Sequence, residues 1–141
     1  MNPGIDPKAE AILKERFGHD VLMALATEED GLPSVRTVNA WYHDGAFYSI
    51  TYAASNKMRH LSKNPRVGLC GEWFTAHGVG ENLGAVLAPQ NRALWETLCE
   101  VFSSWIANGH TDENDPNTVI LKVRLTDGVL FSHGTRYDLT F

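Results

Sequence analysis

The sequence predicts an α+β fold in which a small antiparallel β-barrel carries three flanking helices. Six or seven segments are rich in β-branched and aromatic residues, and most of them follow one another through tight turns. Three helical patterns accompany this series, one at the start of the chain, one in its central part and one in its last third. The length of 141 residues and the hydrophobic fraction of 43% are typical of one folded unit. We therefore expect residues 1–141 to form a single domain.

The first helix and the first strand have clear boundary signals. Asp6 and Pro7 are typical of a helix start, and apolar residues recur on one side of the helix until Phe17. Gly18 then favours termination. The brief apolar run over residues 21–26 predicts a strand, because turn-forming residues follow it.

A β-hairpin with a stronger signal follows this strand. Residues 35–42 and 46–52 are rich in Val, Thr, Ile and aromatic residues, and they flank the sequence His43-Asp44-Gly45. Asp-Gly favours a two-residue turn because both of its positions tolerate a positive φ angle. We therefore predict two antiparallel strands joined at this turn.

The central part of the chain predicts a short helix between two strands. Ser55 can cap this helix, and Pro65 prevents it from continuing beyond Asn64. A strand over residues 67–74 is expected next. A second, glycine-interrupted strand over residues 77–88 is expected to be bent or bulged.

The last third of the chain predicts one long helix and a final pair of strands. After Pro89 the apolar residues fall at helical spacing, and Gly109 is the expected stop. Alternation over residues 119–125 predicts a strand, and Asp127-Gly128 is typical of a turn. The last strand is expected to begin with residues 129–131.

Composition and charge exclude several classes of partner. The net charge of −5 and the pI of about 5.6 argue against general binding to nucleic acids or anionic membranes. No apolar run approaches the ~20 residues that span a bilayer, and the N-terminus lacks the pattern of a signal peptide. We therefore expect a cytoplasmic protein without a nucleic-acid or membrane partner.

The cysteines and histidines give no sign of a metal site. Cys70 and Cys99 lack the spacing of zinc ligands, so we expect both thiols to be reduced and buried in the core. His77 and Glu81 would need a helix to form a metal pair, and the glycines around them disfavour one. No triad of nucleophile, base and acid can be assigned from the sequence.

A local excess of positive charge is the most informative feature of this acidic chain. Residues 54–66 contain four of the twelve basic residues, and no Asp or Glu occurs between Asp44 and Glu72. The helix that Ser55 caps would direct free amide groups and the positive end of its dipole toward the same point. Lys57 lies in its first turn, where the dipole disfavours a cation unless an anion is bound there. A phosphate group would suit this position.

The other basic residues have two interpretations. Arg36 lies in the first strand of the hairpin, where its guanidinium group could grip the same phosphate or could simply point outward from an edge strand. Arg59, Lys63 and Arg66 are interpreted as solvated surface residues. The glycines over residues 78–84 do not match a dinucleotide-binding loop, because its third glycine and the helix after it are missing.

Four segments carry a family resemblance that extends over most of the chain. They are VRTV at residues 35–38, YSIT at 48–51, SNKMRHL at 55–61 and NPRV at 64–67. As an ordered set they resemble the pyridoxamine 5′-phosphate oxidase-like split barrels of the general stress protein type. The resemblance implies a six-stranded antiparallel split barrel with Greek-key connections. It also implies a homodimer with flavin mononucleotide (FMN) between the subunits.

The resemblance also implies which residues contact the cofactor. Arg36 and Lys57 would hold the phosphate, with Ser55 and Asn56 at the start of the helix. Phe131 would reach the flavin of the partner subunit. Main-chain atoms of five further residues would face the ribityl chain and the flavin ring: Thr37, Val38, Asn39, Ile50 and Thr51.

The implied activity is the FMN-dependent oxidation or reduction of a small organic molecule. No side chain is nominated as an acid or a base, because the flavin ring carries the electron chemistry. The true oxidase ends with an Arg-x-His-Asp-Arg-like segment that helps to bind its vitamin substrate, and this chain has only Arg136-Tyr137-Asp138 there. A vitamin B6 substrate is therefore not implied. Two alternatives remain open: a non-enzymatic flavin-binding or sensor protein, and a barrel that binds a deazaflavin or haem.

Overall fold

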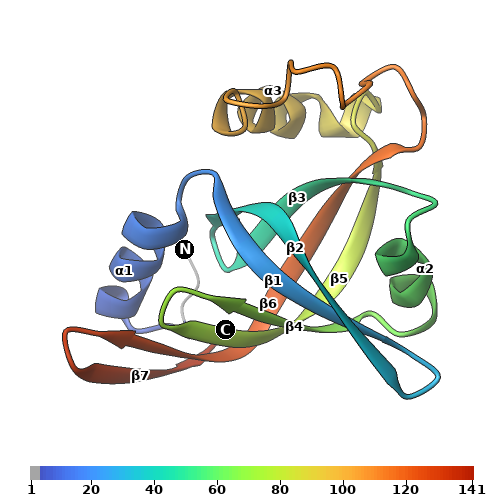
Figure 1. Ribbon diagram of the computed structural model, residues 1–141. Helices are drawn as coiled ribbons and strands as arrows, with labels where there is room; N and C mark the ends of the chain where they lie inside the picture. Colours follow the sequence, from blue (N-terminus) through green and yellow to red (C-terminus); the bar gives the residue numbers. More distant parts are fainter. Residues whose placement is uncertain (1–3) are drawn as a thin grey trace.

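Seven antiparallel strands form one sheet in the computed structural model, which describes residues 4–141. The sheet order is β3-β2-β1-β4-β5-β6-β7, and an additional pairing of β3 with β6 closes the first six strands into a barrel. β7 therefore lies outside the closed barrel (Figure 1). The strands are β1 Val21–Glu29, β2 Leu32–His43, β3 Ala46–Tyr52, β4 Arg66–Gly71, β5 Phe74–Ala85, β6 Thr118–Ser132 and β7 Thr135–Thr140. Since β4 returns beside β1, the first four strands form a Greek key.

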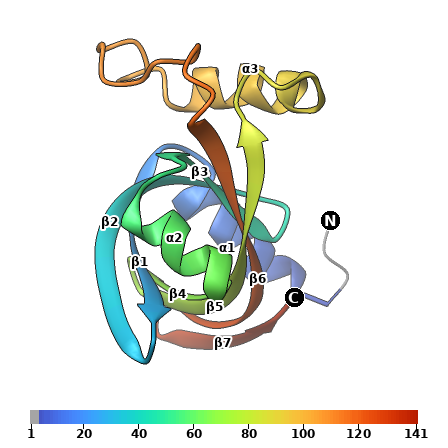
Figure 2. The same cartoon turned by 90° about the vertical axis from the view of Figure 1, so that its right-hand side faces the viewer.

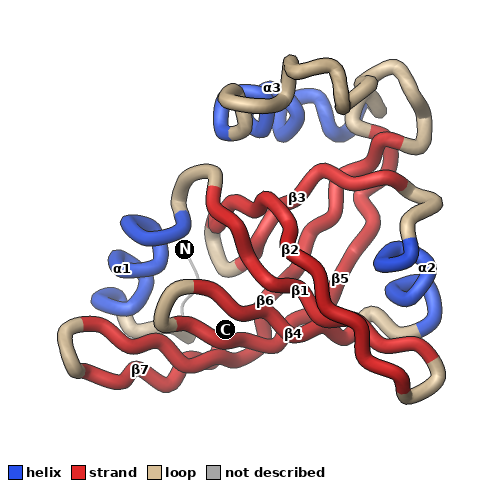
Figure 3. Tube along the Cα trace, viewed as in Figure 1, coloured by secondary structure: helices blue, strands red, loops and turns tan. Residues whose placement is uncertain are grey.

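Two helices cover the ends of this barrel, and a third lies above its wall. Figure 2 shows α2 (Asn56–Lys63) in front of one end and α1 (Pro7–Phe17) behind the other. The third helix, α3 (Arg92–Val101), follows a short 3₁₀ turn at Pro89–Asn91 and precedes a long loop that leads back to β6 (Figure 3). The predicted α+β split barrel with three flanking helices is thus confirmed. None of the helices is long and apolar enough, within residues 4–141, to cross a membrane.

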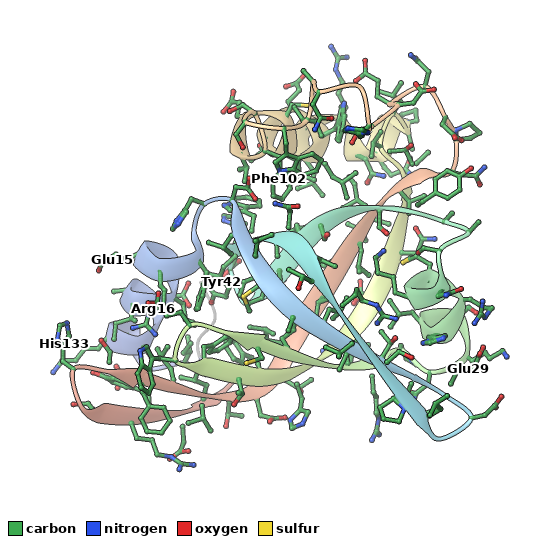
Figure 4. All side chains as sticks on the ribbon, viewed as in Figure 1. Glu15, Arg16, Glu29, Tyr42, Phe102 and His133 are labelled. Atoms are coloured by element: carbon green, nitrogen blue, oxygen red, sulfur yellow. The ribbon has the colours of Figure 1, made fainter. Side chains whose placement is uncertain are left out.

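The barrel interior forms the main hydrophobic core. Alternate residues of the strands point inward, as β1 shows with Met23 and Leu25, of which 1% and 0% is exposed. Helix α1 adds Leu13 and Phe17 to the same core. A second, smaller cluster lies between α3 and the outside of the barrel wall, where Phe102 of the segment after α3 is fully buried (Figure 4).

Several local predictions are confirmed at residue level. Asp6 accepts a hydrogen bond from the amide of Lys8 and caps α1. Ser55 caps α2 by accepting from the amide of Met58. The hairpin turn lies at Asp44-Gly45, where φ is +47° and +79°.

Three predicted boundaries are wrong. The strand predicted over residues 67–74 is interrupted by a turn at Glu72-Trp73, and the long helix ends at Val101 rather than at Gly109. The turn predicted at Asp127-Gly128 is continuous strand, since β6 pairs there with both β5 and β7. A side chain on Gly128 would lie 2.8 Å from the Thr75 carbonyl oxygen, so this glycine permits close strand packing rather than a turn.

The cysteines also differ from expectation. Both thiols are free, but Cys70 is exposed and Cys99 is half-buried. Cys70 is opposite Ala24 in the pairing of β4 with β1, on the outward face of the sheet. A six-residue strand with one buried and one outward face explains why this apolar side chain is not in the core.

Candidate functional site

The barrel wall opens where β2 leaves β3. β2 pairs with β1 over residues 32–40 and with β3 only over residues 41–43. β3 pairs with β6 along residues 46–52. Tyr48 pairs with Trp41, and the residues of β3 after Tyr48 have no partner on β2. The unpaired edge of β3 therefore faces the unpaired edge of β2. Figure 1 shows the two strands diverging, with α2 at the open side. Backbone amides and carbonyls on both edges are available to a ligand.

The two edges contain the five residues whose main chain was predicted to face a flavin. Thr37, Val38 and Asn39 belong to the unpaired stretch of β2, while Ile50 and Thr51 belong to that of β3. The side chain of Asn39 is already engaged, because its Nδ2 donates to Asp20 at 3.0 Å. Ile50 packs in the cluster beneath α3. The Ile50 side chain is therefore not available to a ligand, whereas main-chain groups of both residues lie on the unpaired edges.

The start of α2 lies at the same end of the barrel. Ser55 is its N-cap, and the amides of Asn56 and Lys57 have no carbonyl within the helix to which they could donate. The helix has no acidic residue in its first turn. Amide groups and the helix dipole thus make this terminus attractive to an anion.

Arg36 extends into the barrel end that α2 covers. It is opposite Leu25 in the pairing of β2 with β1, so its side chain lies on the inner face of the sheet. Its Nη1 donates to the Thr27 hydroxyl at 2.6 Å and also contacts the carbonyl oxygen of Leu25 at 3.3 Å. Arg36 is therefore not the outward edge-strand charge that was the alternative interpretation.

Lys57 and Arg36 form an uncompensated pair of cations. Burial lowers the pKa of Lys57, and the charge of Arg36 lowers it further. Burial also lowers the pKa of Arg36. Within residues 4–141 neither side chain makes an ion pair with a carboxylate. Two half-buried cations within electrostatic reach of each other repel unless an anion joins them.

The remaining basic residues of α2 have a different environment. Arg59 and Lys63 are exposed and both bind Glu29, at 3.1 Å and 3.0 Å. These two ion pairs lower the pKa of Glu29 to about 2. Figure 4 places Glu29 beside α2, at the tip where β1 turns into β2. Their interpretation as surface residues is therefore confirmed, whereas Lys57 on the same helix is half-buried and makes no ion pair within the described residues.

Thr51 adds an unsatisfied polar group on the edge of β3. It is 9% exposed, and its hydroxyl is the one buried side-chain oxygen or nitrogen without a partner in the described part of the chain. Buried hydroxyl groups normally make a hydrogen bond, and an exception requires an explanation such as a missing ligand or water. The hydroxyl lies on the strand edge beside the open wall, which fits a site that a polar ligand completes.

Sequence reasoning missed two residues at this site, Thr27 and His60. Both are buried, at 2% and 5% exposed, and they share a hydrogen bond of 2.8 Å. The alternation of inward-facing residues along β1 indicates burial for Thr27, and the inner side of α2 indicates burial for His60. The contact itself joins residues 33 positions apart, and no local pattern in the sequence reports it.

Phe131 is not brought together with the other predicted residues. It lies near the end of the β6–β7 hairpin, two positions before His133, which Figure 4 shows on the opposite side of the molecule from α2. Its ring is 40% exposed, and the Arg136 guanidinium is 6.0 Å from the ring centre. Within one chain it is remote from Arg36 and Lys57.

Solved structures share the fold at low sequence identity. General stress protein 26 from Bacillus anthracis has a TM-score of 0.70 and 16% identity, with 93% of this chain and 98% of that chain covered. A FAD-binding protein from Mesorhizobium loti has a TM-score of 0.67 and 16% identity, over 84% and 90% of the two chains. A heme-binding protein from Mycobacterium smegmatis has a TM-score of 0.65 and 16% identity, over 87% of this chain and 53% of that one. These similarities establish the fold alone.

Family membership comes from the sequence. No curated protein matches the chain. The family model for pyridoxamine 5′-phosphate oxidase matches residues 5–130, which includes the barrel strands up to most of β6 and all three helices. The chain therefore belongs to the pyridoxamine 5′-phosphate oxidase family.

Proposed function

We propose that the chain binds FMN at the open barrel wall and acts as an FMN-dependent oxidoreductase on a small organic molecule. One observation carries the proposal. Arg36 on β2 and Lys57 in the first turn of α2 are half-buried cations without an acidic partner in the described residues, and the charge of Arg36 acts on Lys57. A phosphate monoester carries the charge and the acceptor oxygens that these groups lack. Family membership and the FAD-binding structural neighbour support a flavin as the molecule that bears this phosphate.

The residues at the site fit the remainder of the cofactor as well. The unpaired edges of β2 and β3 offer main-chain donors and acceptors along Thr37, Val38 and Asn39 and along Ile50 and Thr51. The Thr51 hydroxyl lacks a partner that a polar ligand could supply. When bound, FMN would supply the electron and hydride chemistry, while these residues would position it. The chain itself would bind the phosphate, orient the ring and leave one ring face open to the substrate.

A homodimer is part of the same proposal. The outward face of β1, β2, β4, β5 and β6 surrounds a shallow cavity of about 380 Å³, where small and apolar side chains lie beside Thr75, His77 and Asp127. This outer apolar face consists of Ala24, Ala26, Val35, Gly68, Cys70 and Val129. Phe131 follows two positions after Val129 and so points to the same side as this face. A second copy packed here would cover the face, and the partner subunit would bring its own aromatic ring toward the flavin.

The two free cysteines are compatible with the reducing conditions of the cytoplasm, where we place the protein.

The experiment begins with the small molecule that copurifies with the native protein. We expect a yellow protein whose visible spectrum and mass identify FMN, and whose bound flavin is reduced by a nicotinamide cofactor or another small reductant. The spectrum of a haem would contradict the proposed cofactor. A bound flavin that no reductant or oxidant can cycle would leave the binding site intact but would contradict the enzymatic function.

A titration with FMN then tests the residues. The double variant Arg36→Ala/Lys57→Ala loses two charge-assisted contacts, each worth about 1.5–3 kcal/mol, so we expect its affinity for FMN to fall at least about 100-fold. The matched control is Arg59→Ala/Lys63→Ala, which removes two cations from the same end of the barrel where both are already paired with Glu29. We expect this control to bind within about threefold of the wild type, since exposed ion pairs contribute little. Equal affinities of the two double variants would defeat the site assignment.

A further inference from the structure

The guanidinium group of Arg36 is held in place from one side. Nη1 contacts three oxygen atoms: the Thr27 hydroxyl at 2.6 Å, the Leu25 carbonyl at 3.3 Å and the Ser34 carbonyl at 3.4 Å. The contact with Thr27 is the shortest of the three and the only one to a side chain. An arginine has five N–H donors in one plane, so anchoring Nη1 fixes the direction of Nε and Nη2.

The Thr27 hydroxyl is shared between Arg36 and His60. Its Oγ1 lies 2.6 Å from Nη1 of Arg36 and 2.8 Å from Nδ1 of His60. Arg36 can only donate, so Thr27 accepts that bond and its own hydrogen is free to donate to His60. Thr27 is 2% exposed, and a hydroxyl hydrogen that pointed elsewhere would remain buried without a partner. Arg36, Thr27 and His60 thus form a hydrogen-bond relay, in which Arg36 donates to Thr27 and Thr27 donates to His60. In this relay His60 Nδ1 is an acceptor.

His60 is held in turn by its surroundings. It lies on the inner side of α2 and is 5% exposed. Its Nε2 points to the carboxylate of Glu29 at 3.8 Å, which Arg59 and Lys63 keep in position. The relay thus connects three elements, with Arg36 on β2, Thr27 on β1 and His60 on α2. Because Lys57 belongs to the same helix as His60, this connection also fixes the distance between the two cations.

We propose that Thr27 and His60 are positioning residues that aim Arg36 at the phosphate of the cofactor and thereby set the preference for FMN over riboflavin. This inference rests on the proposed function, because it assumes that the phosphate binds at Arg36 and Lys57. FMN and riboflavin differ only in the phosphate group. A residue that acts through Arg36 therefore changes the affinity for FMN and leaves the affinity for riboflavin unaltered.

The test measures the affinities of both ligands for three variants and the wild type. Thr27→Val keeps the shape of the side chain but removes the hydroxyl, and we expect it to weaken FMN binding about 10-fold and riboflavin binding less than twofold. Thr27→Ser keeps the hydroxyl and should restore the wild-type preference. The control Ser62→Ala removes an exposed hydroxyl from α2 whose one hydrogen bond within residues 4–141 goes to the Arg59 carbonyl, and it should change neither affinity.

The outcomes separate the inference from the proposed function. If the wild type binds FMN no better than riboflavin, the phosphate site itself is wrong and the inference falls with it. If the wild type prefers FMN and Thr27→Val keeps the full preference, only the inference is wrong. A Thr27→Val variant that loses both ligands equally would show a structural role and would also overturn it.

A second measurement does not depend on any variant. Nitrogen-15 NMR of the wild-type imidazole, recorded well above the ordinary histidine pKa of about 6.5, reports which ring nitrogen carries the hydrogen. We expect His60 Nδ1 to be without a hydrogen and Nε2 to carry it. A hydrogen on Nδ1 would mean that Thr27 accepts from both neighbours, which contradicts the relay.

Discussion

Lys57 illustrates how a residue proposed to bind an anion can reduce the stability of the protein without that anion. Its ammonium group is half-buried, lies in the first turn of a helix and is close to the charge of Arg36. Each of these three features disfavours the charged form, and burial and Arg36 together lower the pKa of Lys57. A base whose pKa is lower in the folded state destabilises that state at neutral pH, because the unfolded chain holds the proton more tightly.

The variant Lys57→Met should therefore stabilise the protein in the absence of flavin. It keeps an unbranched apolar side chain in place of the lysine stem and removes the unpaired charge. We expect the midpoint of thermal unfolding at pH 7 to rise by a few degrees. The gain should shrink as the pH rises toward the ordinary lysine value of about 10.4, because Lys57 then loses its proton in the folded state.

The comparison for this prediction is Lys63→Met on the same helix. Lys63 is paired with Glu29 at 3.0 Å, so its replacement should leave the midpoint unchanged or lower it slightly. Thermal unfolding followed by circular dichroism on flavin-free protein measures both variants. A lower midpoint for Lys57→Met than for Lys63→Met would mean that Lys57 is not an uncompensated charge.

At this scale the sequence was informative where a charge had no local partner. The stretch without acids between Asp44 and Glu72 identifies Lys57 from the sequence alone. Arg36 was recognised too, but its two interpretations could not be separated, because the direction of a strand residue depends on how the barrel closes. Thr27 and His60 are ordinary core residues in the sequence, and only the packing of α2 against β1 brings them together.

Among the elements, α1 is attached to the barrel through a buried polar contact. The hydroxyl of Tyr42 donates to Glu10 at 2.5 Å and accepts from the amide of Gly45 at 3.2 Å. Figure 4 shows Tyr42 at the barrel end that faces α1. Tyr42 is 1% exposed, and burial and the bond to Glu10 raise the pKa of its hydroxyl. The neutral form of Tyr42 therefore contributes to the docking of this helix.

The variant Tyr42→Phe should destabilise the protein by about 1–3 kcal/mol, because Glu10 would remain buried without its donor. The sign of the pH dependence follows from the raised pKa. Tyr42 contributes its full stability below the unfolded value of about 10, and the contribution is lost as the pH rises toward the folded value. Chemical denaturation at neutral and alkaline pH measures the difference in unfolding free energy between the wild type and Tyr42→Phe, which should decrease above pH ~10.

The control for this prediction is Tyr48→Phe, since the Tyr48 hydroxyl has no hydrogen bond within the described residues. An equal loss of stability in both variants would contradict the role of Glu10.

Element boundaries were predictable where the turn residues act locally. Asp44-Gly45 specifies its hairpin because both residues adopt positive φ angles there. The same dipeptide at Asp127-Gly128 lies in continuous strand, since pairing on both sides of β6 overrides the local preference. Trp73 gave no turn signal at all, although its φ is +52°, because a bulky side chain rarely adopts this conformation. The conformations at Asp127-Gly128 and at Trp73 both depend on tertiary strand pairing, which a local sequence pattern does not contain.

For the whole molecule, the proposed site depends on where the barrel is open and what closes it. β2 and β3 share only three pairs of residues, and the divergence of their remaining edges leaves main-chain groups beside α2. The outer apolar face lies on the other side of the same wall. A homodimer that covers this face would place the partner subunit beside the open edges and would bring in the remote Phe131. The split barrel itself was predictable from the family resemblance, whereas the way two subunits meet is not encoded in any local pattern.

The most direct measurement is a crystal structure of the protein with FMN bound. It gives the distances from the phosphate oxygens to the guanidinium of Arg36 and to Nζ of Lys57. We expect both to be hydrogen-bond distances of about 2.7–3.2 Å, with amides of the α2 start on the same phosphate. FMN bound with its phosphate away from both cations would contradict the account, and so would a crystal in which the two side chains point to opposite surfaces.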